Sequence, residues 1–182
     1  MRKIAALAAL ALALATPSFA DPAPQISADA VSQPAPLAGM SFLAGNWTIA
    51  GGRMPLFGAR PEGSERVTPE LDGKAYFIVD HSVLIGVEGQ NLGTNDSVLL
   101  VYPDHDAIRA EYTNGQVGTA YNVEIVEAGK LVRLTSDKPG VFNQFTYTLQ
   151  DADTIEVTRT FKRKADDDAY VPVVSEILKR IK

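Results

Sequence analysis

The chain has 182 residues, a formal net charge of −5, no cysteine and two histidines. This length suits one domain with a hydrophobic core, and the absence of cysteine excludes disulfides and thiolate metal sites. Because no basic cluster is long enough to follow a phosphate backbone, nucleic acid is not an expected partner.

Residues 1–20 have the pattern of a secretory signal peptide. Arg2 and Lys3 precede an Ala/Leu run, and the segment closes on small residues that end at Ala20. The apolar run is shorter than the ~20 residues that a membrane-spanning helix needs, and no later segment is apolar enough. We therefore expect cleavage after Ala20 and an exported protein, periplasmic or secreted, with no membrane span.

Residues 21–39 are predicted to be a flexible leader. They are rich in proline and alanine and contain no aromatic residue, so they bury too little apolar surface to offset the entropy cost of ordering. From residue 40 the chain changes to short runs of β-branched and aromatic residues separated by turn residues. This pattern predicts one β domain over residues 40–182.

Nine runs in this domain are predicted to be strands. They are residues 46–50, 64–68, 74–85, 97–102, 107–113, 119–127, 130–136, 143–149 and 154–164. The last segment, 170–182, is ambiguous: its apolar residues follow helical spacing, whereas a closed sheet needs a final strand to meet the first. We favour the strand.

The short turns between these runs make consecutive strands antiparallel neighbours. About nine such strands in one sheet leave two unpaired edges, and curling the sheet until its first and last strands pair removes both. The predicted fold is therefore all-β, an up-and-down antiparallel barrel of about 8–10 strands. A β-sandwich is the alternative, because periodicity does not distinguish a curled sheet from two stacked ones.

The single tryptophan lies at the start of the first predicted strand, in Gly45-Asn46-Trp47. A large flat side chain there suits a plug at the narrow end of a small barrel. The motif resembles the G-x-W of the calycin superfamily, which includes the lipocalins. Together with Phe42 and Leu43 it also resembles the start of bacterial lipocalin-like and nitrobindin-like domains.

The resemblance implies structural roles for three residues. Trp47 would close the barrel, Gly45 would allow close backbone approach, and a basic side chain from the barrel end would cover the indole. Arg180 occupies the position that the resemblance implies for that basic residue. The alternative is that Trp47 is ordinary core and Arg180 a solvated charge.

A haem cofactor is not expected, although the nitrobindin-like resemblance raises it. In that family a histidine on a late strand ligates the iron, but the histidines here are His81 and His105, and none follows. Two distant histidines without cysteine also make a poor zinc site. His105 lies in a predicted turn, so we expect neither cofactor nor metal.

Arg159 and His81 are candidate ligand-binding residues. Arg159 alternates with apolar residues on one strand face, and a buried arginine needs a carboxylate, a phosphate or water. It could anchor a carboxylate-bearing ligand, as in the fatty-acid carriers of the same superfamily, unless a bulge or barrel end exposes it. His81 shares a face with Phe77 and Val79, so it is predicted to point inward, either to a ligand or as a hydrogen-bonded core residue.

Three aromatic residues complete the candidate site. Tyr112 and Tyr147 lie on the apolar faces of their strands, where they would line a pocket or fill the core. Residues 51–63 form a long predicted loop carrying Phe57, which would act as a lid over the barrel mouth or fold back onto the core.

These features favour the binding of a small apolar or amphipathic molecule, one that could bear a carboxylate. The chain lacks a nucleophile elbow, an H-E-x-x-H, a Walker A and a G-x-G-x-x-G motif, so an enzyme is the less favoured interpretation. Its version here is an isomerase or cyclase that uses His81 and a tyrosine as acid and base. A dry structural or interaction barrel of the cell envelope is the third alternative. The sequence specifies neither the ligand nor the oligomeric state.

Overall fold

A computed structural model describes residues 36–138, 142–162 and 169–182. These residues form one short 3₁₀ helix, η1 (Ala38–Leu43), and ten strands. The strands are β1 (Gly45–Arg53), β2 (Arg60–Glu70), β3 (Ala75–Ile85), β4 (Asn91–Asp104), β5 (Ala107–Thr113), β6 (Gly118–Glu127), β7 (Leu131–Ser136), β8 (Phe142–Asp151), β9 (Thr154–Lys162) and β10 (Val171–Arg180). The predicted signal peptide, 1–20, and leader residues 21–35 lie outside the described residues.

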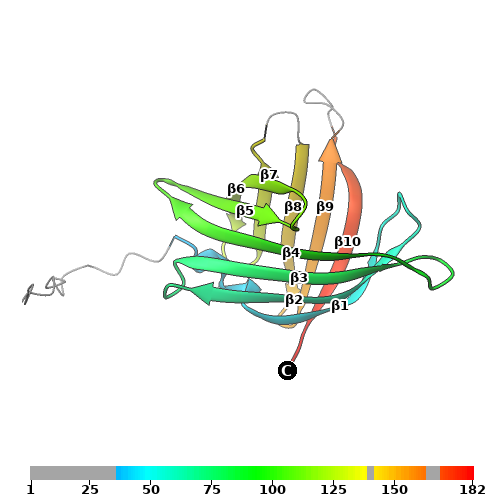
Figure 1. Ribbon diagram of the computed structural model, residues 1–182. Helices are drawn as coiled ribbons and strands as arrows, with labels where there is room; N and C mark the ends of the chain where they lie inside the picture. The colour runs from blue at the N-terminus through cyan, green and yellow to red at the C-terminus, as the bar shows by residue number, and fades with distance from the viewer. Residues whose placement is uncertain (1–35, 139–141, 163–168) are drawn as a thin grey trace, which may run out of the picture. The chain divides into compact units, whose positions relative to one another are not determined.

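The ten strands close into one antiparallel barrel. Each strand pairs with its neighbours in sequence, and β1 pairs with β10 in the register Trp47↔Arg180 to Arg53↔Ser175. In Figure 1, β2, β3 and β4 cross in front of β8, β9 and β10. The predicted up-and-down barrel is therefore confirmed, and the sandwich alternative is wrong. The helical spacing of the last segment is overridden because β10 supplies the hydrogen bonds that close the sheet.

The core fills the barrel with inward side chains from alternate positions. The fully buried residues include Leu37, Met40, Leu43, Trp47, Val101, Val132, Leu134, Ile155, Val157 and Leu178. Outward positions on the same strands carry polar or partly exposed side chains. This period-two pattern is what allowed the strands to be predicted from the sequence.

The hairpin between β1 and β2 replaces the long loop predicted over residues 51–63. Met54 and Ala59 extend the ladder through a bridge, with the Met54 N–H donating to the Ala59 carbonyl at 2.7 Å. Both side chains are buried with Val174 in a small second cluster. Only residues 55–58 form the turn, so the predicted lid is wrong: the segment is a hairpin tip.

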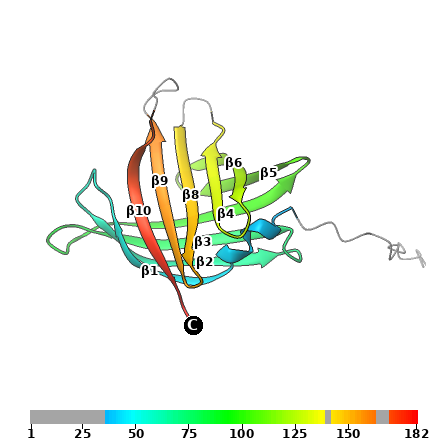
Figure 2. The same ribbon diagram turned by 180° about the vertical axis from the view of Figure 1, so that it is seen from behind.

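One end of the barrel is closed by η1. Met40 and Leu43 are buried, and the Gly39 carbonyl accepts a hydrogen bond from the Gly129 N–H at 2.7 Å, which joins η1 to the turn between β6 and β7 (Figure 2). Leu37 is fully buried as well. The predicted leader, 21–39, thus contributes its last residues to the core.

Trp47 lies against η1 at this closed end. Its side chain is fully buried, and the indole N–H donates to the Leu43 carbonyl at 2.8 Å. The guanidinium carbon of Arg180 lies 4.1 Å from the centroid of the indole ring. The indole therefore has a polar partner for its one donor and a cation over its face.

Arg180 also hydrogen-bonds the backbone that enters β1. Its Nη1 donates to the Ala44 carbonyl at 2.7 Å and its Nη2 to the Phe42 carbonyl at 3.2 Å. Gly45 has φ +136°, and a Cβ there would lie 2.5 Å from Arg180 Nη1. A glycine is required at this position because any side chain would displace the guanidinium and strain the backbone.

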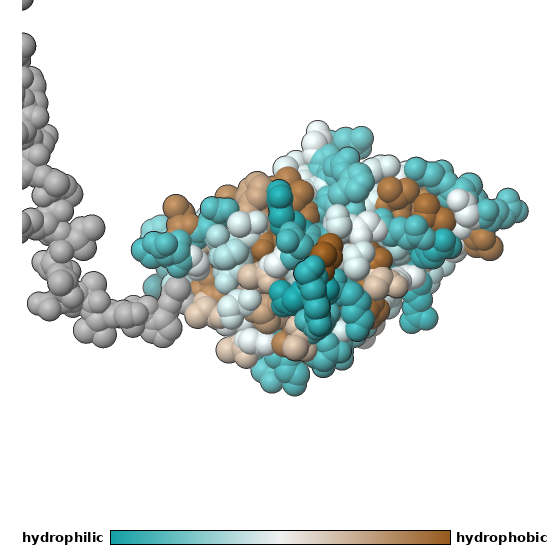
Figure 3. Space-filling model, turned by 90° about the horizontal axis from the view of Figure 1, so that it is seen from below, coloured by the Kyte–Doolittle hydropathy of each residue, from teal (hydrophilic) through white to brown (hydrophobic). Residues whose placement is uncertain are grey.

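The described surface carries both hydrophilic and hydrophobic side chains. Seen from below, the hydrophobic ones form small separate areas (Figure 3). Scattered exposed apolar residues of this kind are ordinary in folded proteins. Within the described ranges, no helix has the length and hydropathy needed to span a membrane.

Candidate functional site

A cavity lies inside the barrel, above the closed end. It is lined by Glu65, Ile78, Asp80, Ser97, Leu99, Tyr112, Phe145, Tyr147 and Arg159. The cavity volume is about 20 Å³. The interior is therefore narrow, with room for about one water molecule as the side chains stand.

A row of polar side chains crosses the cavity wall on three neighbouring strands. Glu65 on β2 is directly opposite Asp80 on β3, and Asp80 is opposite Ser97 on β4. All three are at least 94% buried. Two carboxyl groups directly opposite each other repel when both are ionised, so this row needs compensation.

Arg159 supplies the positive charge. Its Nη2 lies 3.5 Å from Asp80 Oδ2 and 3.6 Å from Glu176 Oε2, and its guanidinium carbon lies 5.2 Å from the centroid of the Phe145 ring. The side chain is 20% exposed, and its Nε has no hydrogen-bond partner among the described residues. Arg159 thus joins β9 to β3 and β10 across the barrel.

Asp80 is the best satisfied of the acids. Asn95 Nδ2 donates to its Oδ2 at 2.7 Å, and the Ser82 hydroxyl donates to the same oxygen at 3.3 Å. Tyr112 in turn donates its hydroxyl to Asn95 Oδ1 at 3.5 Å. With Arg159 beside it, Asp80 is part of a connected network of polar side chains.

Glu65 is the least satisfied acid. Its Oε2 accepts a hydrogen bond from the Tyr147 hydroxyl at 3.4 Å, but its Oε1 has no partner among the described residues. Burial and the neighbouring charge of Asp80 raise the pKa of Glu65 to about 8, although Arg159 acts in the opposite direction. At neutral pH the Glu65 side chain is therefore a neutral carboxylic acid.

Burial and neighbouring charges also shift the pKa values of the other titratable groups in or beside the cavity. Burial raises the pKa of Glu176, and Arg159 opposes that rise. Burial lowers the pKa of Arg159, but the charges of Glu176 and Asp80 outweigh it, so the pKa stands above its ordinary value. Burial raises the pKa of Tyr147 well above the usual range. The arginine is charged and the phenol neutral at physiological pH.

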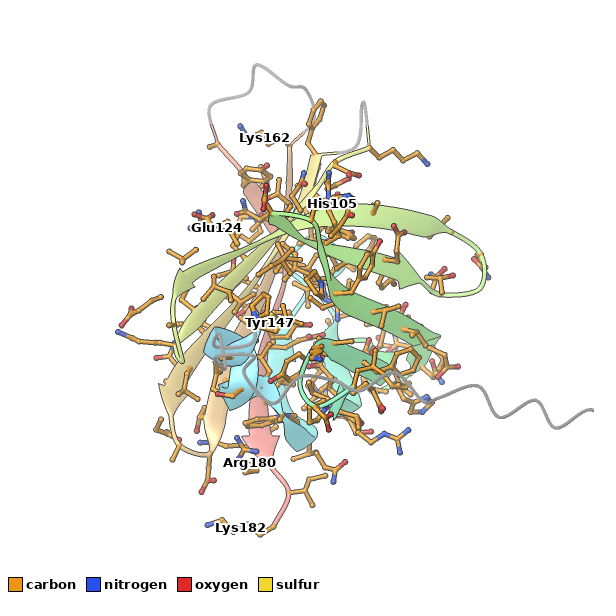
Figure 4. The ribbon with its side chains drawn as sticks, turned by 90° about the vertical axis from the view of Figure 1, so that its left-hand side faces the viewer. His105, Glu124, Tyr147, Lys162, Arg180 and Lys182 are labelled. Atoms are coloured by element: carbon orange, nitrogen blue, oxygen red, sulfur yellow. The ribbon has the colours of Figure 1, made fainter. Side chains whose placement is uncertain are left out.

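Three predicted ligand-binding residues meet at this cavity: Arg159, Tyr112 and Tyr147 all line it. Figure 4 shows Tyr147 inside the ring of strands, with Arg180 at the lower end and His105 near the periphery. In the described part of the chain, no group of three His, Cys, Asp or Glu side chains is arranged to hold a metal ion.

His81 lies outside the cavity, so its predicted inward position is wrong. On β3 the buried positions are Tyr76, Ile78 and Asp80, while Phe77 and His81 face outward. The His81 side chain is 58% exposed and pairs with Asp96 on the neighbouring strand. Both faces of β3 carry apolar residues, so the alternation of residue types did not identify the inward face, and His81 was assigned to the wrong side.

Phe57 does not line the cavity either. It lies in the turn at the β1–β2 hairpin tip and is 65% exposed. The hairpin ladder, extended by Met54 and Ala59, holds the tip away from the interior. An isomerase or cyclase that uses His81 as its acid or base is also excluded, because His81 and the tyrosines of the cavity lie on opposite sides of the barrel wall.

The sequence analysis missed Glu65, Asp80 and Glu176. Each occupies an inward position between apolar or small neighbours two residues away, as Glu176 does between Val174 and Leu178. A charged residue in phase with the apolar face of a strand was the available signal. Of the four charged residues that carry it, only Arg159 was recognised.

Comparison with known proteins adds little. No protein-family model matches the chain, and no curated protein matches it significantly. A solved structure described as "EF1p2_mFAP2b bound to DFHBI" aligns with 12% identity over 79% of this chain and 98% of that chain, with a TM-score of 0.42. A likeness this distant carries no conclusion about function.

Proposed function

We propose that this protein binds a small molecule inside its barrel, at the cavity between Glu65, Tyr147 and Arg159. The observation that carries the proposal is the pair of buried, unpartnered atoms, Glu65 Oε1 and Arg159 Nε. Buried polar groups in folded proteins nearly always have a hydrogen-bond partner. A bound molecule would supply the partner that the described residues do not.

The cavity suits a ligand with an apolar body and a polar end. Ile78, Leu99 and Phe145 form an apolar wall opposite the polar row. Because the free space is small, the ligand must be small too, or Tyr112 and Phe145, which are only partly buried, must turn outward to admit it. This arrangement supports an amphipathic occupant.

A carboxylate ligand is disfavoured. Arg159, its predicted anchor, already faces Asp80 and Glu176, so a third acid would meet repulsion rather than an unpaired cation. Export remains part of the proposal and is supported by the signal-like pattern of residues 1–20. The site of action is then periplasmic or extracellular.

The test is to purify the full chain, extract it with solvent and analyse the extract by mass spectrometry. A recurrent small molecule is expected from the wild type and from the control Leu100→Trp, which adds bulk on the outer face of β4. Leu99→Trp, which fills the cavity from the same strand, should lose it. Repeatedly empty wild-type extracts, from hosts that export the protein, would contradict the proposal.

A structural barrel is the second candidate, and the narrowness of the interior favours it. The cavity volume is only about 20 Å³, so the interior of the barrel is nearly filled by its own side chains. For this alternative, Leu99→Trp and Leu100→Trp would differ in stability but not in extract composition. The same experiment therefore separates the two functions.

A further inference from the structure

The middle of the barrel holds more acidic than basic side chains. Among the described residues, the carboxyl groups of Glu65, Asp80 and Glu176 face one guanidinium, that of Arg159. The other arginine near the interior, Arg180, is engaged at the closed end with backbone carbonyls and Trp47. Three carboxyl groups in or beside the cavity thus share one basic side chain.

Glu65 is the acid left without one. Four groups from four other strands face it: Asp80 on β3, Tyr147 on β8, Arg159 on β9 and Glu176 on β10. Arg159 lies within ion-pair distance of the other two acids but not of Glu65. Glu65 is 97% buried and lines the cavity, and its Oε1 is unpartnered in the described structure.

We infer that the cavity receives a small organic cation, an amine or amidine, whose charged nitrogen donates a hydrogen bond to Glu65 Oε1. The inference rests on the proposed function and specifies its ligand class. Ile78 and Leu99 would contact the apolar part of the ligand. Phe145 and Tyr147 would offer ring faces to the charge, as aromatic groups do for ammonium and amidinium ions.

Binding of the cation should release one proton, that of Glu65. A cation beside Glu65 favours its carboxylate form, so the carboxylic acid loses its proton to solvent as the ligand enters, and no covalent bond forms or breaks. The raised pKa of Glu65, which burial and Asp80 cause, means that this proton is present before binding at neutral pH. Ligand affinity should therefore increase as pH rises toward the pKa of Glu65.

The experiment uses three planar molecules of nearly the same shape: acetamidinium, acetamide and acetate. Each is titrated into the full chain while NMR follows the methyl resonances of Ile78 and Leu99. We expect acetamidinium to bind at least ~10-fold more tightly than acetamide and acetate not to bind, because ~1.4 kcal/mol of charge preference gives that ratio. Proton release, measured in weak buffer, should accompany acetamidinium alone.

Two matched variants locate the effect. Glu65→Gln keeps the shape of the neutral acid, so it should fold at neutral pH, yet it should lose the proton release and most of the tenfold preference. Glu111→Gln removes the same group from an exposed position on β5 and should behave as the wild type. Equal loss in both variants would overturn the inference.

The outcomes separate this inference from the proposed function. Tighter binding of acetamide or acetate would overturn the cation preference and leave small-molecule binding intact. Absence of any methyl shift with acetamidinium would also overturn the inference, whereas the proposed function would then stand or fall on the solvent extract. Acetamidinium binding without proton release would overturn the role of Glu65.

Discussion

The barrel contains two inward-reaching arginines in contrasting settings. Arg180 closes one end, where two backbone carbonyls accept from its Nη atoms at 2.7 and 3.2 Å and an indole lies beneath it. Arg159 lies in the middle, between two acids at 3.5 and 3.6 Å, with its Nε unpartnered among the described residues. The first is held by neutral partners at its Nη atoms and has one partly exposed acid, Asp153, 3.7 Å from its Nε; the second lies between two buried acids.

The difference shows how a stable plug and a candidate site can be built from the same side chain. At the closed end each group satisfies another, and no acid is left over. In the middle, three acids and one base are buried together. Their desolvation costs free energy that well-packed apolar residues at the same positions would not cost. The middle of the barrel contains this unfavourable cluster of charged groups although the rest of the core is apolar. It is therefore a better candidate for a functional site than the closed end.

The largest expected effect is at the closed end. Trp47→Ala should lower the free energy of unfolding by about 5 kcal/mol, because it leaves a cavity and removes the surface that Arg180 covers. Urea unfolding followed by circular dichroism measures it. Trp47→Phe serves as the control and should cost clearly less. A loss below about 1 kcal/mol for Trp47→Ala would show that the plug does not hold the barrel end.

Arg159→Met should lower the free energy of unfolding by about 4 kcal/mol at neutral pH, since it leaves Asp80 and Glu176 buried without a counter-charge. The loss should shrink in acid, where both carboxyls can be protonated. Urea titrations at the two pH values measure it. A loss that is independent of pH would show that packing, rather than charge, is what Arg159 contributes.

Glu65 should make the free energy of unfolding decrease as pH rises. A salt-bridged acid would have the opposite effect. Its pKa in the folded state, about 8, lies above the ordinary value of 4.5, so the folded state binds more protons and the free energy of unfolding falls as pH rises between these values. Relative to Glu65→Gln, the wild type should lose about 2 kcal/mol from about pH 5 to about pH 7. Thermal melts of both proteins over this range test it. Parallel pH profiles for the two would contradict the raised pKa.

Arg180→Lys should have the smallest effect, a loss of about 1 kcal/mol. Lysine keeps the charge over the indole but cannot donate to two carbonyls in the geometry of a planar fork. Urea unfolding of wild type and variant, at one pH, is sufficient. If Arg180→Lys destabilised as strongly as Trp47→Ala, the closed end would depend on the cation rather than on the indole.

The fold followed from the sequence because its physical determinants are local. Alternation and turn residues marked the strands, and the cost of unpaired edges predicted closure. The segment that ends at Arg180 was ambiguous because its apolar spacing also suits a helix, and only the partner strand, β1, decides between them. Closure is a long-range property that no local window contains.

The candidate site was less predictable. Arg159, Tyr112 and Tyr147 could be placed on inward faces, but His81 was assigned to the wrong face because β3 is apolar on both. Glu65 and Asp80 escaped notice because they lie far from Arg159 in the sequence and are brought near it by the closure of the barrel, whereas Glu176 reaches Arg159 through the pairing of β9 with β10. Which charge meets which depends on register across strands, and register is set by the whole sheet.

The pairing of β1 with β10 has a consequence for the order of folding. Trp47 and Arg180 lie on the two strands that close the barrel, so the strand pair most distant in the sequence is also the one that removes both open edges. Until β10 is available, a nascent chain exposes two strand borders that can pair with other chains. Pairing of β1 with β10 therefore protects the folded chain from pairing with other chains through its strand edges.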